Sequence, residues 1–307
     1  MDTKTLKIMV LGLANVGKTS ILYTLEKKYS LLGTLAPTKG IERSSFKIFG
    51  FQVSAWDLGG QDQYRKAFLQ KNILFEETDM LMFVIDVKDP KNYETAFDYY
   101  QKILEIITES NQNQNPVILI LLNKVDPDTK NSPEIRKNIK LLTDMFQAGS
   151  KTFKVDFFET SIYDEWSLIK ALSHGIRSLS TKTELLSQNL AEFAKKILAT
   201  AMILLNQNGY LIAEYIFANN EKSAFSCQSI STQCMYMYLV MKERNIVPEK
   251  ITVDLKDEYI VFREVSIEDE HFFIIFNSKV PRSLELFKEF FPKFAEQTKD
   301  IIKFFFT

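Results

Sequence analysis

The stretch Gly12-Leu13-Ala14-Asn15-Val16-Gly17-Lys18-Thr19, followed by Ser20, matches the pattern G-x-x-x-x-G-K-[ST] and decides the fold of the first half of the chain. A short apolar run, Leu6 to Leu11, precedes it and is typical of a buried parallel strand. Ser20 to Lys28 follows, with apolar residues at helical spacing. A strand, a glycine-rich loop and a helix in this order favour phosphate binding, because the loop amides and the helix N-terminus direct partial positive charge at an anion.

This loop predicts a nucleotide site with magnesium. We expect residues 12 to 20 to surround the phosphates, and Lys18 to reach the β- and γ-phosphates. The Thr19 hydroxyl is placed to ligate Mg²⁺. Lys18 is also a candidate catalytic residue, because its charge can stabilise the phosphoryl group during transfer.

A second threonine lies in a loop that favours the same site. Leu35 to Gly40 reads as a loop, and Ile41 to Ile48 then alternates in the manner of an edge strand. Thr38, between the first helix and this strand, can fold over the γ-phosphate and give Mg²⁺ a second hydroxyl ligand. We therefore count Thr38 among both the metal ligands and the catalytic candidates.

A third predicted strand, Gln52 to Trp56, ends in Asp57-Leu58-Gly59-Gly60-Gln61. Asp57 at the carboxyl end of a strand can hold Mg²⁺, usually through water. The Gly60 amide can bond the γ-phosphate, since no side chain blocks the approach. Gln61 is placed to orient a water that attacks the γ-phosphate.

A base-reading motif follows a later strand. The buried runs Met80 to Ile85 and Val117 to Leu122 predict two strands, and the second runs into Asn123-Lys124-Val125-Asp126. The Asp126 carboxylate can accept hydrogen bonds from the N1–H and the exocyclic amine of guanine, whereas adenine has no matching pair of donors. Asn123 is expected to tie this loop to the phosphate loop, and the Lys124 stem to pack on the base.

The last strand of this half, Val155 to Glu159, leads into Thr160-Ser161-Ile162-Tyr163-Asp164. Backbone amides there, chiefly that of Ile162 beside Ser161, can donate to guanine O6, and Tyr163 can cover the other face of the ring. Because all these motifs follow strands, we expect them at one edge of a mostly parallel sheet flanked by helices, an α/β architecture that binds GTP or GDP. One of the helices is the amphipathic segment Asn92 to Ser110, which the polar tract Asn111 to Pro116 follows as a loop.

These motifs resemble two related families. Ile21-Leu22-Tyr23, the Pro37-Thr38-Lys39-Gly40 loop and Trp56-Asp57-Leu58-Gly59-Gly60-Gln61-Asp62 are similar to the Arf family of small GTPases. Thr160-Ser161-Ile162-Tyr163-Asp164-Glu165, the continuation Ile169-Lys170-Ala171-Leu172-Ser173 and the presence of a second domain are similar to Rag/Gtr GTPases. The chain is identified as similar to a Rag/Gtr-type small GTPase with Arf-like motifs.

The resemblance implies a GTPase domain over residues 1–180 and a dimerisation domain over 181–307. It implies a molecular switch that hydrolyses GTP to GDP and phosphate, slowly unless a partner completes the site. It also implies activating and exchange proteins, and a homodimer or a heterodimer with a Rag-like GTPase through 181–307.

Beyond the polar segment Ser178 to Thr183, which reads as a linker, the predicted order is helix, two strands, helix, three strands, helix. Gln207-Asn208-Gly209 favours a tight hairpin. The order resembles the roadblock-like domain of Rag proteins and the related longin domains, with a five-stranded antiparallel sheet. The predicted elements are a helix with Leu186, Leu190, Phe193 and Ile197 on one stripe, strands 201–206 and 210–217, a helix 220–244, strands 251–255, 259–265 and 272–277, and a helix from Pro281 that Pro292 kinks or divides.

Residues 181–307 contain no pattern of catalytic residues. We expect His271 on a strand surface and Cys227 with Cys234 in a core typical of a reducing compartment. The phenylalanines of the last helix are expected to pack on the sheet rather than bind a membrane. The methionines of the middle helix favour a core or an interface, namely Met235, Met237 and Met241.

The composition and the two chain ends limit which classes of protein, partner and membrane attachment we expect. A chain of 307 residues can form two domains with their own cores, and 46% apolar residues indicate a globular rather than a disordered protein. A net charge of −1 gives no basic field, so we expect no nucleic-acid partner. No apolar run approaches the roughly 20 residues of a membrane span. Asp2 argues against myristoylation, and Lys303 to Thr307 contains no cysteine for prenylation.

We therefore expect a cytoplasmic protein without a direct membrane anchor, with recruitment to a membrane through partners left open. Two other functions are open. One is a scaffold that binds nucleotide without hydrolysing it, which the intact Gln61 disfavours. The other is an Arf-like traffic GTPase with an unrelated C-terminal adaptor, which the missing lipidation sites disfavour.

Overall fold

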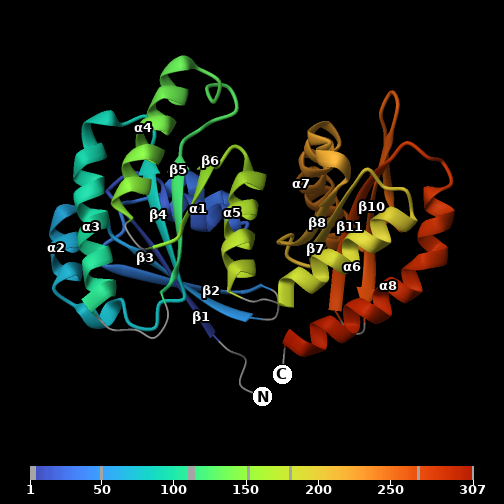
Figure 1. Cartoon of the computed structure of the whole chain (residues 1–307), viewed down its shortest axis with the longest axis horizontal. Helices are drawn as coiled ribbons and strands as arrows, with labels where there is room; N and C mark the ends of the chain where they lie inside the picture. The colour runs from blue at the N-terminus through green and yellow to red at the C-terminus, as the bar shows by residue number, and fades with distance from the viewer. Residues whose placement is uncertain are drawn as a thin grey trace. The chain divides into compact units, whose positions relative to one another are not determined.

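A computed structural model describes residues 5–48, 51–109, 115–150, 153–179, 182–267 and 270–305. The chain divides into two compact units (Figure 1), the first ending at Leu179 and the second beginning at Ser180. Parts of four segments named from the sequence lie outside the described residues. They are the helix Asn92 to Ser110, the tract Asn111 to Pro116, the linker Ser178 to Thr183 and the end Lys303 to Thr307.

The first unit contains a six-stranded sheet in the order β2-β3-β1-β4-β5-β6. Its pairs β1–β3, β1–β4, β4–β5 and β5–β6 are parallel, so the mostly parallel sheet expected from the sequence is confirmed. In a parallel sheet the carboxyl ends of the strands share one edge, where ligand-binding loops gather. The strands are β1 (Thr5–Gly12), β2 (Ile41–Ile48), β3 (Phe51–Leu58), β4 (Met80–Asp86), β5 (Val117–Asn123) and β6 (Val155–Thr160).

Helices flank this sheet, as Figure 1 shows. The sequence patterns predicted α1 and α3 but no helix at α2, α4 or α5. The signals for α4 are local: the Ser132 hydroxyl accepts a hydrogen bond from the Ile135 amide at 3.3 Å, and Pro133 occupies the first turn. The elements are α1 (Lys18–Leu25), α2 (Asp62–Leu69), α3 (Tyr93–Glu109), α4 (Pro133–Gly149) and α5 (Glu165–Ser178), with short 3₁₀ helices at Tyr29–Thr34, Asn72–Leu74 and Pro90–Asn92.

An aromatic cluster fixes β4 in the core of this unit. Phe83 of β4 contacts Tyr100 of α3 and Phe146 of α4 with ring centroids 5.2 and 5.8 Å apart. All three side chains are fully buried. Burial of such rings contributes strongly to stability, so the cluster holds the strand whose carboxyl end carries part of the candidate site.

The second unit contains a five-stranded sheet in the order β8-β7-β11-β10-β9, and all its strand pairs are antiparallel. The five-stranded antiparallel sheet expected from the sequence is confirmed. Its elements follow the expected order and are α6 (Lys182–Lys196), β7 (Ala201–Asn206), β8 (Leu211–Ile216), a 3₁₀ turn Phe217–Asn219, α7 (Glu221–Glu243), β9 (Ile251–Asp254), β10 (Tyr259–Ile267), β11 (Glu270–Ser278) and α8 (Ser283–Phe305).

The faces of this sheet are covered by different helices. Phe193 of α6 stacks on Phe294 of α8 at 4.5 Å, and Phe287 of α8 stacks on Phe276 of β11 at 5.7 Å. The expected packing of the last helix on the sheet is therefore confirmed. The other face of the sheet packs against α7, where the ring centroids of Tyr238 and Phe273 are 4.9 Å apart.

Several smaller expectations can be compared with this unit. Pro292 lies inside α8 and does not divide it. Cys227 and Cys234 are buried free cysteines, as expected of core residues. His271 is half-exposed on β11 and faces Glu264 at 3.1 Å, which confirms its surface position.

Met235 is buried in α7, whereas Met237 is exposed. Within the described residues, no cluster of three or more His, Cys, Asp or Glu could hold a metal ion. None of the helices in the described part of the chain has both the length and the apolar character needed to cross a bilayer.

Candidate functional site

The loop between β1 and α1 adopts a backbone that requires glycine at two positions. Gly12 and Gly17 have φ values of 140° and 99°. A Cβ on Gly12 would lie 2.3 Å from the Val84 carbonyl oxygen, and one on Gly17 would lie 2.6 Å from Asn123 Nδ2. Side chains at either position would therefore both strain the loop and displace the neighbouring strand or loop.

The loop forms one wall of a cavity of about 250 Å³. Its other walls come from the segment around Thr38 and from the end of β3, so three segments far apart in the sequence meet there. The lining residues are Ala14, Asn15, Gly17, Lys18, Thr19, Ser20, Leu35, Ala36, Pro37, Thr38, Gly60 and Gln61. Leu13 and Val16 of the same loop are buried.

Lys18 lies in the interior of this loop. Its Nζ donates to the carbonyl oxygens of Leu13 at 2.7 Å and Gly12 at 3.3 Å. Burial lowers the pKa of Lys18 to about 8, although the negative charge of Asp57 opposes the shift. An anion next to this ammonium group would favour its charged form.

Three oxygen-bearing side chains converge beside Lys18. Asp57 Oδ2 accepts hydrogen bonds from the hydroxyls of Thr19 at 2.5 Å and Thr38 at 3.1 Å, and the two hydroxyl oxygens are 2.9 Å apart. Burial raises the pKa of Asp57, although the Thr19 hydrogen bond, the Lys18 charge and the Thr38 hydrogen bond act in the opposite direction. These are the three residues that the sequence analysis named as metal ligands.

The same three residues fit Mg²⁺ by their chemistry. All three groups offer oxygen, which Mg²⁺ prefers. Asp57 Oδ1 is buried and lacks a hydrogen-bond partner within the described part of the chain. A buried carboxylate oxygen without a partner is costly, so a cation there would relieve an unfavourable desolvation.

Gly60 lies directly against the phosphate loop. A Cβ added to it would be 2.2 Å from the Leu13 carbonyl oxygen, so only glycine permits this approach. The preceding Gly59 donates its amide to the Gly40 carbonyl oxygen at 2.9 Å, which links the end of β3 to the Thr38 segment. Gln61 follows at the start of α2 and lines the cavity.

At the other end of the sheet edge, Asn123 joins two loops. Its Nδ2 donates to the Val16 carbonyl oxygen at 2.7 Å, and its Oδ1 accepts a hydrogen bond from the Thr160 hydroxyl at 3.1 Å. Asn123 is almost fully buried. It therefore connects the phosphate loop to the segments after β5 and β6.

Asp126 is held by two donors. Its Oδ1 accepts from the Ser161 hydroxyl at 2.6 Å and its Oδ2 from Lys88 Nζ at 2.7 Å. Burial alone would raise the pKa of Asp126, but the hydrogen bonds from Lys88 and Ser161 outweigh it and keep the pKa below its usual value. The Tyr163 amide donates to the Ser161 hydroxyl at 3.1 Å, and the Tyr163 ring is 76% exposed. Ile162 lies between them, half-buried.

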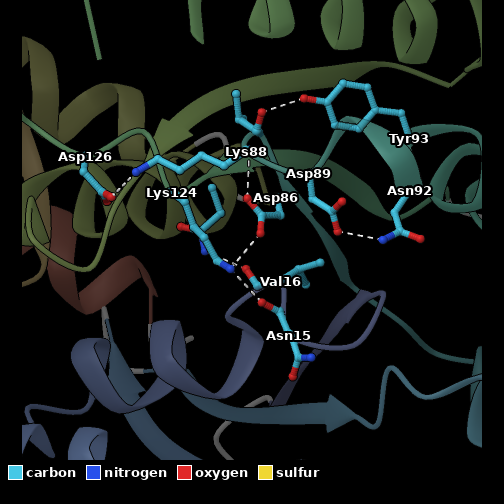
Figure 2. A network of polar contacts seen from close by, with 11 residues as sticks. Asn15, Val16, Asp86, Lys88, Asp89, Asn92, Tyr93, Lys124 and Asp126 are labelled. Carbon is cyan, nitrogen blue, oxygen red and sulfur yellow. Dashed lines mark hydrogen bonds and ion pairs between the residues drawn. The ribbon is translucent and has the colours of Figure 1, made fainter. Parts of the chain in front are cut away.

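Lys124 spans the space between the two halves of the site (Figure 2). Its Nζ donates to the Asn15 carbonyl oxygen at 2.9 Å and pairs with Asp86 Oδ2 at 2.7 Å. Lys124 has a left-handed φ of 67°, which turns the chain at the end of β5. Its ammonium group thus connects the segment after β5 to Asp86 at the end of β4 and to Asn15 in the loop between β1 and α1.

Two residues at the site, Asp86 and Lys88, were absent from the sequence prediction. Both follow the buried run Met80 to Ile85, at the carboxyl end of a strand predicted to be parallel. The rule that placed Asp57 and Asp126 at the site applies to this strand end as well. The signal was therefore present in the sequence.

The comparisons with known proteins identify the family. The model described as "Gtr1/RagA G protein conserved region" matches residues 7–234 of the 307. The chain belongs to the Gtr1/RagA G protein family. It is therefore a Rag-type GTP-binding switch and a GTPase, and the resemblance seen in the sequence is confirmed.

Individual relatives are distant. The chain is 26% identical to "Ras-related GTP-binding protein A" of Dictyostelium discoideum over 240 residues, covering 76% of this chain and 77% of that protein. It is 27% identical to "Ras-related GTP-binding protein B" of Rattus norvegicus over 208 residues, covering 66% of this chain but only 54% of that protein.

A solved small GTPase from Trypanosoma brucei with a bound nucleotide analogue is also similar, at 18% identity and a TM-score of 0.46 over 57% of this chain and 98% of that one.

The role of Asn123 as a connector can be tested with Asn123→Ala. The change leaves the Val16 carbonyl and the Thr160 hydroxyl without their partner, and each buried group left unpaired costs about 1–3 kcal/mol. We expect the free energy of unfolding to fall by about 2 kcal/mol or more and GDP affinity to fall at least tenfold.

Chemical denaturation and GDP titration measure the two effects. Thr108→Ala is a matched control, because the Thr108 hydroxyl donates within α3, to the Leu104 carbonyl. GDP affinity within twofold of the wild-type value would contradict the connecting role.

Proposed function

We propose that the cavity binds the phosphates of GTP and GDP together with Mg²⁺, and that GTP hydrolysis there changes the order of the segments that carry Thr38 and Gly60. The observation that carries the proposal is the convergence of Thr19, Thr38 and Asp57 beside the buried Lys18. Thr38 belongs to a loop that can move away when the γ-phosphate leaves.

Each residue of the phosphate end has a proposed role. The loop from Gly12 to Ser20 binds the β- and γ-phosphates through its amides, and Lys18 stabilises the charge of the transferred phosphoryl group. Thr19 and Thr38 would hold Mg²⁺ directly, and Asp57 would hold it directly or through water. When bound, the ion would neutralise negative charge on the β- and γ-phosphates.

Hydrolysis needs a positioned water. The Gly60 amide would bond the γ-phosphate, and Gln61 would orient the attacking water for in-line displacement of GDP. Because none of the described residues that line the cavity is an arginine, the intrinsic rate should be slow, and an activating protein would supply the missing charge. The proposed catalytic residues are therefore Gln61, Lys18 and Thr38.

The base end would read guanine. Asp126 would accept from the N1–H and the exocyclic amine, and the amides at Ser161 and Ile162 would donate to O6. The exposed ring of Tyr163 would cover one face of the base and the stem of Lys124 the other. Asn123 would hold this end of the site against the loop from Gly12 to Ser20, through its hydrogen bond to Val16.

Gln61→Leu tests the hydrolytic role. Leucine cannot orient water, whereas the phosphate and base contacts remain, so we expect GTP hydrolysis to slow at least tenfold while GDP affinity stays within about threefold. Single-turnover hydrolysis of GTP measures the rate. Gln70→Leu, at an exposed position just after α2, is the control. An unchanged rate in the Gln61 variant would remove this residue from the mechanism, and no hydrolysis by the wild-type chain would favour a nucleotide-bound scaffold.

Asp126→Asn tests the base assignment. An amide side chain presents a donor where guanine also presents donors, but it can pair with the oxygen at C2 of xanthine. We expect GDP affinity to fall about a hundredfold and xanthosine diphosphate affinity to rise. Competition binding of the two nucleotides provides the measurement. Asp128→Asn removes the same charge from an exposed neighbour and should leave the preference for guanine unchanged.

The second unit would pair with another Rag-like chain, as a roadblock- or longin-like dimerisation domain over 181–307. Its α7 exposes large apolar side chains along the surface opposite the sheet, among them Phe225 at 64% and Tyr236 at 63% exposure. Exposed apolar surface of this kind marks interaction sites. The Rag/Gtr resemblance implies a Rag-like partner. That partner is either a second copy of this chain, giving a homodimer, or a different Rag-like chain, giving a heterodimer.

Tyr236→Glu on α7 tests this pairing, because burying an unpaired carboxylate in an apolar interface is strongly unfavourable. We expect light scattering to give the mass of a two-chain particle for the wild-type chain, alone or mixed with a Rag-like partner, and of single chains for the variant. Leu185→Glu places the same charge on the exposed surface of α6 and should leave the dimer intact. A Tyr236→Glu particle of unchanged mass would contradict pairing through α7.

The Rag/Gtr resemblance also implies activating and exchange proteins. It further suggests action in the cytoplasm, with recruitment to a membrane through partner proteins.

A further inference from the structure

Four charged residues of alternating sign join the end of β4 to the base side of the site (Figure 2). Lys124 Nζ pairs with Asp86 Oδ2, and Lys88 Nζ pairs with Asp126 Oδ2, each at 2.7 Å. The Lys88 amide also donates to Asp86 Oδ1 at 2.9 Å. The Asp86 carboxylate therefore holds the side chain of Lys124 and the backbone of Lys88.

The backbone that carries Lys88 is held from three sides. The Val87 amide donates to the Asn123 carbonyl oxygen at 3.0 Å, and the Val87 carbonyl accepts from the Tyr93 hydroxyl at 2.6 Å and from Asn138 Nδ2 at 3.1 Å. Tyr93 and Asn138 are buried, so these contacts are shielded from water. Lys88 thus extends toward Asp126 from a rigid support, not from a free loop end.

The contacts at Asp126 leave room for a base. An ionised carboxylate has about four acceptor positions on two oxygens. Ser161 uses one position on Oδ1 and Lys88 one on Oδ2, so each oxygen retains a position for a further donor. A pair of adjacent N–H groups, as on the guanine edge, can use the two remaining positions without displacing either side chain.

The two donors also fix the orientation of the carboxylate. Ser161 comes from the segment after β6 and Lys88 from the segment after β4, so they hold the Asp126 oxygens from different strands. A carboxylate that is held before the ligand arrives loses less conformational freedom on binding. The positive charge of Lys88 also favours the ionised acceptor form, and with Ser161 it keeps the pKa of Asp126 low.

We propose that Lys88 is a positioning residue for guanine recognition, which holds the Asp126 carboxylate in the orientation that accepts the base. Lys88 acts through Asp126 and is not a ligand of the nucleotide. The inference rests on the proposed role of Asp126 as the base-reading residue. It adds a determinant of nucleotide affinity from the segment after β4, to which the proposed function gives no role.

A double-mutant cycle on the full chain tests the inference, with GDP as the titrated ligand. Lys88→Met keeps the length of the side chain and removes its charge. Because Lys88 is partly exposed, we expect GDP affinity to fall by roughly fivefold. Lys88→Arg should restore most of the affinity, since it keeps the charge. Lys140→Met, on an exposed position of α4, removes one positive charge elsewhere and should have no effect.

The cycle is completed by Asp126→Asn and by the double variant. If Lys88 acts through Asp126, Lys88→Met should change GDP affinity by less than about twofold once Asp126 is replaced. The same roughly fivefold loss in both backgrounds would overturn the inference, because Lys88 would then act through the fold in general. Unchanged GDP binding by Lys88→Met would also overturn the inference. Tighter GDP binding would overturn it as well, because it would show that Lys88 competes with the base.

The two proposals fail in different ways. If Asp126→Asn alone leaves GDP affinity unchanged, the base assignment is wrong and the role of Lys88 falls with it. If Asp126→Asn weakens GDP binding but Lys88→Met does not, the base assignment stands and only the positioning role is wrong.

Discussion

The buried carboxylate of Asp57 is the constraint on which the rest of the first unit depends. It accepts hydrogen bonds from Thr19 at the start of α1 and Thr38 in the following loop, while its second oxygen lacks a partner within the described residues. A buried charge that is only partly satisfied costs stability unless a cation or further donors complete it. The proposed binding of a divalent ion and the proposed closing of the Thr38 segment over the cavity would thus have the same physical origin.

The order of the strands turns separate motifs into one site. Because β1 lies between β3 and β4, and β5 lies between β4 and β6, the loops after these strands are neighbours along one edge. Asn123 and Lys124 then reach back to the phosphate loop, at Val16 and Asn15. Asp86 and Lys88 connect the same loops through β4. The segments after β1, β4, β5 and β6 are consequently coupled by side chains.

The parts that the sequence predicted are those with local signatures. The loop from Gly12 to Thr19 is recognisable because its spacing and its flanking strand and helix are contiguous, and the same holds for Asn123 to Asp126. The Lys88–Asp126 pair joins residues 38 positions apart, and it depends on β4 and β5 being adjacent. Single-sequence patterns do not specify such adjacency. Helix α2 was missed for a different reason: eight residues with one buried side chain, Phe68, give little periodicity.

The most direct test of this account is the rate of GDP release with and without free Mg²⁺, in the wild-type chain and in Asp57→Asn. If Thr19 and Asp57 hold the ion while GDP is bound, chelation by excess EDTA should accelerate GDP release from the wild-type chain at least tenfold, because the phosphates lose a counter-charge. The Asp57→Asn chain should release GDP quickly in both conditions. Release from the wild-type chain at the same rate with and without EDTA would contradict the central claim that the oxygen groups around Asp57 form a magnesium site.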